Sequence, residues 1–115
     1  MATKAEVVLR AAQMLQRVRL GQAIDNTLQT RIETAYTEVY EDLKDDQLVT
    51  WAVAGTIPDK VAPWLAALMA FNTTDSIHVS ESVFSRIVAK RNVAKREIRR
   101  LVTPKYETVD DGEDY

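Results

Sequence analysis

Residues 63–71, Pro-Trp-Leu-Ala-Ala-Leu-Met-Ala-Phe, decide the fold that we predict for this chain. Such a stretch is apolar almost all round a helix, which is typical of a helix that other helices enclose. Pro58 and Pro63 suit the first turns of that helix, where a missing amide donor costs little. The polar residues 72–76 favour its end. We therefore expect a central helix here.

The N-terminal residues predict a first helix. Thr3 and Glu6 form a capping box, and the apolar residues that follow recur at helical spacing. Gly21 is the residue type that commonly ends a helix in a left-handed conformation. The pattern predicts a helix over about 4–19.

A stripe of apolar residues at spacings of four, three, four and four predicts a second helix. The stripe comprises Leu28, Ile32, Ala35, Val39 and Leu43. A side chain among residues 25–27 can cap its start. Negative charge after it opposes the helix dipole, so we expect the helix to stop near Lys44. Tyr36 and Tyr40 are expected to close the edge of the stripe.

The rest of the chain predicts a connector and a last helix. Residues 47–57 are read as an irregular connector that tucks Leu48 and Trp51 against the bundle. Ser80 caps the last helix, and the Thr-Pro pair at 103–104 stops it. Its inward stripe comprises Val83, Ile87, Ala94, Ile98 and Leu101.

These elements predict an all-α fold. We expect a small bundle of about four helices over residues 1–103, followed by a flexible acidic tail over 104–115. A length of 115 residues with 46% hydrophobic residues suits one domain with its own core. We expect six residues in that core: Leu15, Leu28, Ile32, Trp64, Leu68 and Ile98.

The composition argues against several kinds of chemistry. The chain has no cysteine, which removes disulfides and thiolate ligands. Its three glycines cannot supply a glycine-rich phosphate loop. His78 is the single histidine and lacks the partners that a zinc site requires. We therefore expect no metal, no cofactor and no enzymatic activity.

The clearest chemical signal is the charge of the last helix. Its basic residues are Arg86, Lys90, Arg91, Lys95, Arg96, Arg99 and Arg100. They could dock on an acidic partner, bind the phosphates of a nucleic acid, or simply favour the C-terminal end of the helix dipole. The second helix offers a complementary acidic face, made of Glu33, Glu38, Glu41 and Asp42.

The acidic tail is a second candidate docking element. Tyr106, Val109 and Tyr115 are its sizeable apolar residues, and Asp110 and Asp111 could meet basic side chains of a partner. Ordering a chain costs backbone entropy, so we expect the free monomer to leave this segment without a fixed structure. A solubilising tail that contacts nothing is the alternative.

The order of these segments resembles a known protein family over residues 3–102. The resemblance rests on Thr3-Lys4 and Val8-Leu9-Arg10-Ala11-Ala12, Ile24-Asp25, Tyr40-Glu41-Asp42-Leu43, the Trp51 connector, Ile57-Pro58, Trp64-Leu65-Ala66-Ala67-Leu68 and the final basic helix with its tail. In this layout the chain is similar to the head-to-tail adaptor, or head completion, proteins of tailed bacteriophages. It most resembles the tail accessory factors of short-tailed phages.

The resemblance implies a structural protein of the virion, made in the host bacterial cytoplasm and placed at the head–tail junction. Members of the family form a ring, commonly twelve-fold, beneath the portal protein. The ring extends the DNA channel and offers a platform for tail proteins, and DNA passes through without sequence-specific binding. The alternative function is a small helical DNA-binding or packaging regulator that uses the basic helix 86–105.

The two charged helices allow two arrangements. A basic face of one copy against an acidic face of the next is a heterologous contact, which closes into a ring where the rotation permits. The same two faces could also pack within one chain. The sequence leaves both arrangements open.

Overall fold

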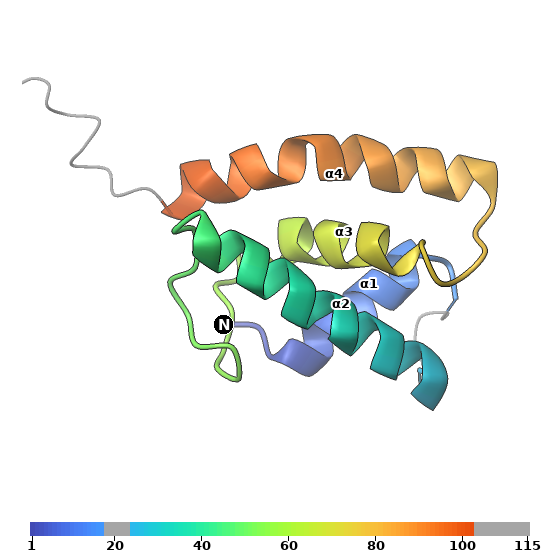
Figure 1. Ribbon diagram of the computed structural model, residues 1–115, viewed down its shortest axis with the longest axis horizontal. Coiled ribbons are helices and arrows are strands. Elements are labelled where there is room, and N and C mark those ends of the chain that lie inside the picture. Colours follow the sequence, from blue (N-terminus) through green and yellow to red (C-terminus); the bar gives the residue numbers. More distant parts are fainter. Residues whose placement is uncertain (18–23, 103–115) are drawn as a thin grey trace, which may run out of the picture.

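The computed structural model describes residues 1–17 and 24–102, which form four helices (Figure 1). These helices are α1 (Lys4–Met14), α2 (Asn26–Asp45), α3 (Ala62–Thr73) and α4 (Glu81–Val102). Outside the helices, an isolated antiparallel bridge joins Ala2 to Ile57. The predicted all-α bundle is confirmed. Within the described ranges, no helix combines the length and the apolar character needed to cross a membrane.

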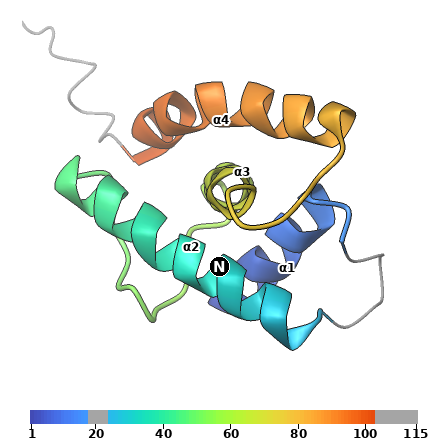
Figure 2. The same ribbon diagram turned by 45° about the vertical axis from the view of Figure 1, so that its right-hand side comes forward.

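The helix α3 lies at the centre of the bundle, as predicted (Figure 2). It contacts all three other helices, with α4 on one side and α1 and α2 on the other. Its buried residues are Ala62, Leu65, Ala66, Ala67, Met69, Ala70 and Thr73. The hydroxyl group of Thr73 donates a hydrogen bond of 2.8 Å to the Met69 carbonyl, which satisfies a polar group inside the core.

The start of α3 differs in one respect from the prediction. Pro63 lies in the first turn, as expected, but Pro58 precedes the helix. The Pro58 carbonyl accepts hydrogen bonds from the N–H groups of Val61 (3.0 Å) and Ala62 (3.1 Å). Proline is well suited to begin this turn because its φ angle is already fixed near the helical value.

The first helix is shorter than predicted. The capping box is present: the Thr3 hydroxyl accepts from the Glu6 N–H (3.1 Å) and the Glu6 carboxylate from the Thr3 N–H (2.8 Å). The helix nevertheless ends at Met14 rather than near residue 19. Gln16 adopts a φ of 57°, a left-handed conformation that a right-handed helix cannot contain. Gly21, the predicted end, lies outside the described residues.

The caps of α2 and α4 are formed by predicted residues. The Asp25 carboxylate accepts from the backbone N–H groups of Thr27 (3.1 Å) and Leu28 (3.2 Å). The Ser80 hydroxyl accepts from the N–H group of Val83 (3.3 Å). Each bond satisfies an amide that the first turn of a helix leaves unpaired.

The core contains only part of the predicted set. The buried members are Leu15, Ile32 and Ile98. The members that pack on the core but stay partly exposed are Leu28, Trp64 and Leu68. Together with Phe71, which is also partly exposed, Trp64 and Leu68 follow one another at helical spacing along α3. This stripe is partly exposed because α2 and α4 diverge from their C-terminal ends (Figures 1 and 2), so Trp64 and Leu68 border the core instead of lying inside it as predicted.

The tyrosines of α2 fasten the connector to the bundle. Tyr36 is fully buried; its hydroxyl group donates to the Val53 carbonyl (2.9 Å) and accepts from the Trp51 indole N–H (3.3 Å). The Tyr40 hydroxyl group donates to the Trp51 carbonyl (2.8 Å). Burial raises the pKa of Tyr36 because it disfavours the phenolate. Tyr36 is therefore a core residue rather than an edge residue, whereas Trp51 is buried as expected.

We predict that Leu65→Ala destabilises the fold more than Leu68→Ala. Leu65 is completely buried in α3, and such a truncation costs about 2–5 kcal/mol because it leaves a cavity. Leu68 is partly exposed, so water can occupy part of the space that its side chain leaves. Urea denaturation of both variants measures the two free energies of unfolding. Equal losses would contradict the assignment of Leu68 to an exposed stripe.

We also predict that Tyr36→Phe lowers the free energy of unfolding by about 1–3 kcal/mol, since it removes two hydrogen bonds and leaves the Trp51 N–H unpaired. Tyr115→Phe is the matched control because it makes the same chemical change at the last residue, outside the described bundle. Thermal denaturation followed by circular dichroism compares the two variants. A Tyr36→Phe protein as stable as the control would show that the connector is held by other contacts.

Candidate functional site

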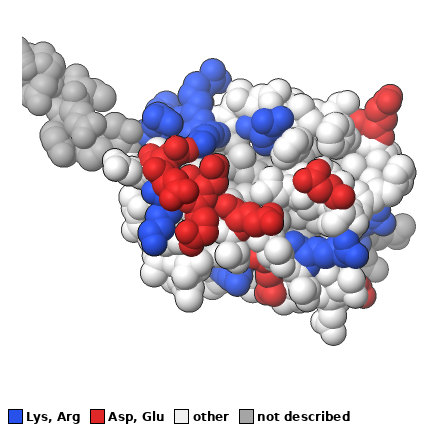
Figure 3. All heavy atoms as spheres, in the orientation of Figure 1, with Lys and Arg blue, Asp and Glu red and all other residues white. Residues whose placement is uncertain are grey.

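The C-terminal end of α2 carries a dense group of exposed carboxylates. We call Glu41, Asp42, Asp45 and Asp46 the acidic cluster. Figure 3 shows acidic side chains next to basic ones where the C-terminal ends of α2 and α4 meet. The cluster concentrates negative charge at the end of the bundle at which α4 carries its last cations.

The acidic face predicted from sequence is not a single face. Glu33 and Asp42 are nine residues apart, and at about 100° per residue they fall on opposite sides of α2. Glu33 is partly buried and accepts a hydrogen bond from the Gln29 side chain (3.3 Å). Glu38 is exposed one turn before the acidic cluster. Only Glu41 and Asp42 of the predicted set belong to the cluster.

Lys95 joins the acidic cluster to α4. Its ammonium group contacts the carboxylates of Asp42 (3.5 Å) and Asp46. The hydrogen bond from Lys95 lowers the pKa of Asp46, and the same bond raises the pKa of Lys95. One of the two arrangements left open by the sequence, acidic against basic within a chain, is therefore present at the helix ends.

The basic residues of α4 are spread around the helix rather than gathered in one patch. Arg86 and Lys90 line a hollow beside Met14 of α1. Arg91 and Lys95 face α2 instead. The remaining three are exposed: Arg96, Arg99 and Arg100. Among the ion pairs formed within the described ranges, Arg100 contacts Glu97 (2.8 Å), its neighbour on the same helix.

A groove runs between α2 and α4, with α3 as its floor. Its volume is about 540 Å³, and it is lined by Val39, Asp42, Leu68, Phe71, Asn72, Arg91, Asn92 and Lys95. The guanidinium carbon of Arg91 lies 4.2 Å from the centre of the Phe71 ring, in cation–π geometry. Phe84 extends this apolar surface, since its ring centre is 6.2 Å from that of Phe71 and the residue is 40% exposed.

Arg91 brings a buried polar atom into the groove that no described residue satisfies. Its Nε atom is buried and makes no hydrogen bond to any described residue. A guanidinium group has five N–H donors and stays charged at all accessible pH values. A buried donor without an acceptor costs free energy. This end of the groove therefore favours a ligand that brings an acceptor, and above all a carboxylate.

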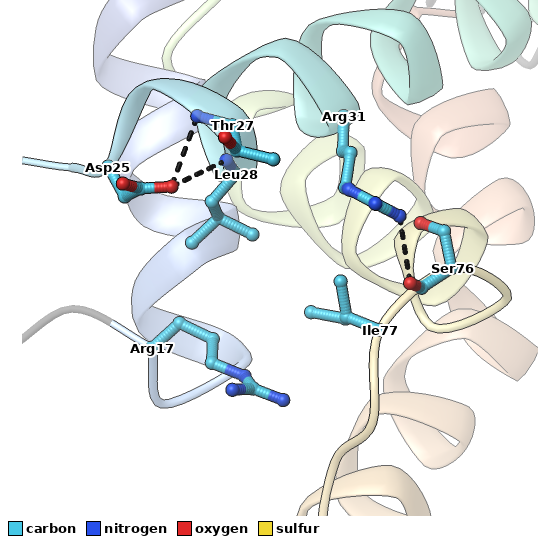
Figure 4. Close-up of a pocket in the computed structure, with 7 residues that line it drawn as sticks. All are labelled: Arg17, Asp25, Thr27, Leu28, Arg31, Ser76 and Ile77. Carbon is cyan, nitrogen blue, oxygen red and sulfur yellow. Dashed lines mark hydrogen bonds between the residues drawn. The ribbon is translucent and has the colours of Figure 1, made fainter.

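A second hollow lies at the start of α2 (Figure 4). There Arg31 donates to the Ser76 carbonyl (2.8 Å), and Arg17 donates to the carbonyl of His78. The Asp25 carboxylate in the same hollow is occupied by its cap contacts. The two arginines thus hold the segment between α3 and α4 against α1 and α2. This hollow is a structural junction, and His78 contributes its backbone to it.

The last two points concern metal ligands and the predicted tail residues. Within the described ranges, no three His, Cys, Asp or Glu side chains are arranged to hold a metal ion. The predicted tail residues Tyr106, Val109, Asp110, Asp111 and Tyr115 lie outside the described residues.

The groove itself is absent from the sequence predictions. The apolar stripe of α3 is the sequence feature that corresponds to it. The pattern predicts this stripe as core, because apolar spacing does not reveal which neighbours cover a helix. Comparisons with protein-family models, curated proteins and solved structures found no match to this chain.

We predict that Lys95→Met raises the pKa of Asp46 toward the ordinary aspartate value. In the wild type, Lys95 favours the charged carboxylate, so its contribution to stability is present above the ordinary pKa and is lost as the pH falls through the lowered one. Carboxyl-carbon NMR titration measures this pKa, and Lys60→Met is an exposed control. An unchanged pKa in Lys95→Met would contradict the contact.

Proposed function

We propose that this chain is a structural subunit that assembles with copies of itself into a ring joining the head of a tailed bacteriophage to its tail. The ring would lie beneath the portal protein, receive tail proteins on its other side and let DNA pass through its channel. The placement in a virion rests on the resemblance in segment order. The self-assembly is supported by the charges of the bundle.

The observation that carries the proposal is that this small chain exposes both acidic and basic residues that form no ion pair with a described residue. Glu41 and Asp45 are exposed, and neither forms an ion pair with a described residue. Lys90 and Arg96 on α4 are likewise exposed and form no such pair. Among the described residues, Lys95 pairs with Asp42 and Asp46, so the charges of Glu41, Asp45, Lys90 and Arg96 can meet another molecule.

A second copy can provide opposite charges both for the acidic cluster and for the exposed basic residues of α4. The α4 surface of one copy and the acidic cluster of the next differ from each other, so their contact is heterologous. A heterologous contact repeats from copy to copy and closes when the rotation between neighbours divides a full turn. Complementary charge also speeds association and fixes the orientation of the partners.

We predict that the double variant Lys90→Glu, Arg96→Glu stays folded but assembles at least about tenfold more weakly, because like charges then face each other across the contact. The control is Arg10→Glu, Lys60→Glu, which reverses two exposed cations elsewhere on the bundle. Native mass spectrometry over a concentration series measures the oligomers, and circular dichroism checks the fold. Both assays use the full chain, with and without purified portal protein.

A charge-swapped partner makes this test specific. In Glu41→Lys, Asp45→Lys both charged surfaces are basic, whereas in Lys90→Glu, Arg96→Glu both are acidic. Neither variant should assemble alone, and an equimolar mixture should form oligomers in which the two alternate. A mixture that stays monomeric would contradict the proposed contact between copies. Tight, steeply salt-dependent binding of duplex DNA by the wild type, without oligomers, would instead favour a DNA-binding function.

A further inference from the structure

The groove between α2 and α4 has the features of a docking site for an extended segment. Its floor is apolar, formed by Leu68 and Phe71, and Phe84 prolongs it at one mouth. Polar side chains form its walls, among them Asn72 and Asn92, which can meet a peptide backbone. These groups require an occupant with apolar side chains for the floor and hydrogen-bonding groups for the walls.

The charge inside the groove specifies the occupant further. Lys95 at the mouth near the helix ends is already engaged by Asp42 and Asp46. Arg91, deeper in the groove, makes no ion pair with a described residue, and its buried Nε donor has no acceptor. A carboxylate next to Arg91 would satisfy that donor and gain a charge-assisted hydrogen bond. The segment that fits the groove therefore carries a carboxylate together with aromatic or aliphatic side chains.

One segment of this chain has that composition and lies outside the described residues. Residues 103–115 carry Tyr106 and Val109 directly before Asp110 and Asp111. Extended, these thirteen residues reach up to about 43 Å. The distance along α4 from Val102 back to Arg91 is about 16 Å, at 1.5 Å per residue. The segment is therefore longer than the stretch of α4 from Arg91 to Val102, and it can extend beyond its own molecule.

We propose that residues 103–115 of a second copy occupy this groove, with Tyr106 and Val109 on Leu68 and Phe71 and a carboxylate of Asp110 or Asp111 on Arg91. A segment folding back on its own molecule would enter past the acidic cluster, where Glu41 and Asp45 are exposed, form no ion pair with a described residue and repel its carboxylates. A segment from a second copy can enter at the Phe84 mouth. The inference rests on the proposed self-assembly, which brings copies side by side.

The test is photo-cross-linking in the full chain. Tyr106 is replaced by benzoyl-phenylalanine, and the protein is mixed with an equal amount of an isotope-labelled copy that carries the same replacement. After irradiation, mass spectrometry identifies the cross-linked peptides. We expect links from residue 106 to peptides containing Leu68, Phe71 or Arg91, and mixed-isotope pairs among them. Links confined to one molecule, or links that avoid the groove, would overturn the inference.

Two further measurements assign the role of Arg91. Arg91→Gln should lower the yield of groove links by about tenfold, the effect expected from losing a charge-assisted hydrogen bond. Arg86→Gln, on the α1 side of α4, should leave the yield unchanged. Added synthetic peptide 103–115 should compete for the groove of the wild type, whereas the peptide with Asp110→Lys and Asp111→Lys should not. Failure of this competition would overturn the inference even if Arg91→Gln did not fold.

The oligomeric mass of the wild type separates this inference from the proposed function. Rings that form without groove links would overturn the groove assignment and leave the ring standing. Groove links between copies in a protein that forms only dimers would support the groove assignment and overturn the ring.

Discussion

The structure depends on the need of α3 to remove its apolar surface from water. The other three helices supply that burial, and each covers a different part of α3. Their own packing follows from it: α1 and α2 contact each other on one side, and α4 is held on the other. Because α2 and α4 diverge, the stripe through Trp64, Leu68 and Phe71 stays partly exposed, and Leu68 and Phe71 form the floor of the groove.

The elements that local chemistry determines could be predicted from sequence. The capping box at Thr3, the Asp25 cap and the Ser80 cap each depend on residues within one helical turn. The central position of α3 also followed, since a helix that is apolar on nearly every side has to be surrounded. The end of α1 could not be predicted in this way, because a left-handed turn at Gln16 replaced the glycine stop that the pattern suggested.

For the candidate site, the sequence predicts the charged residues but not their arrangement. The signs and numbers of the basic residues on α4 and the acidic ones on α2 are properties of sequence. Their grouping depends on the rotation of each helix and on its neighbours: Glu33 faces away from Asp42, and Arg86 lies in a hollow beside α1 whereas Arg91 faces α2. To predict the groove, one has to know that α2 and α4 diverge, and no local sequence pattern gives the angle between two helices.

The contact of Lys95 with Asp42 and Asp46 makes the link between α2 and α4 sensitive to salt. It fastens α2 to α4 at one end only, and it is made of exposed charges that salt screens. Salt therefore weakens this link between α2 and α4, while the packing of both helices on α3 and the hydrogen bonds of Tyr36 and Tyr40 stay in place. The strength of the contact between α2 and α4 therefore follows the ionic strength of the solution, whereas the apolar packing around α3 does not depend on it.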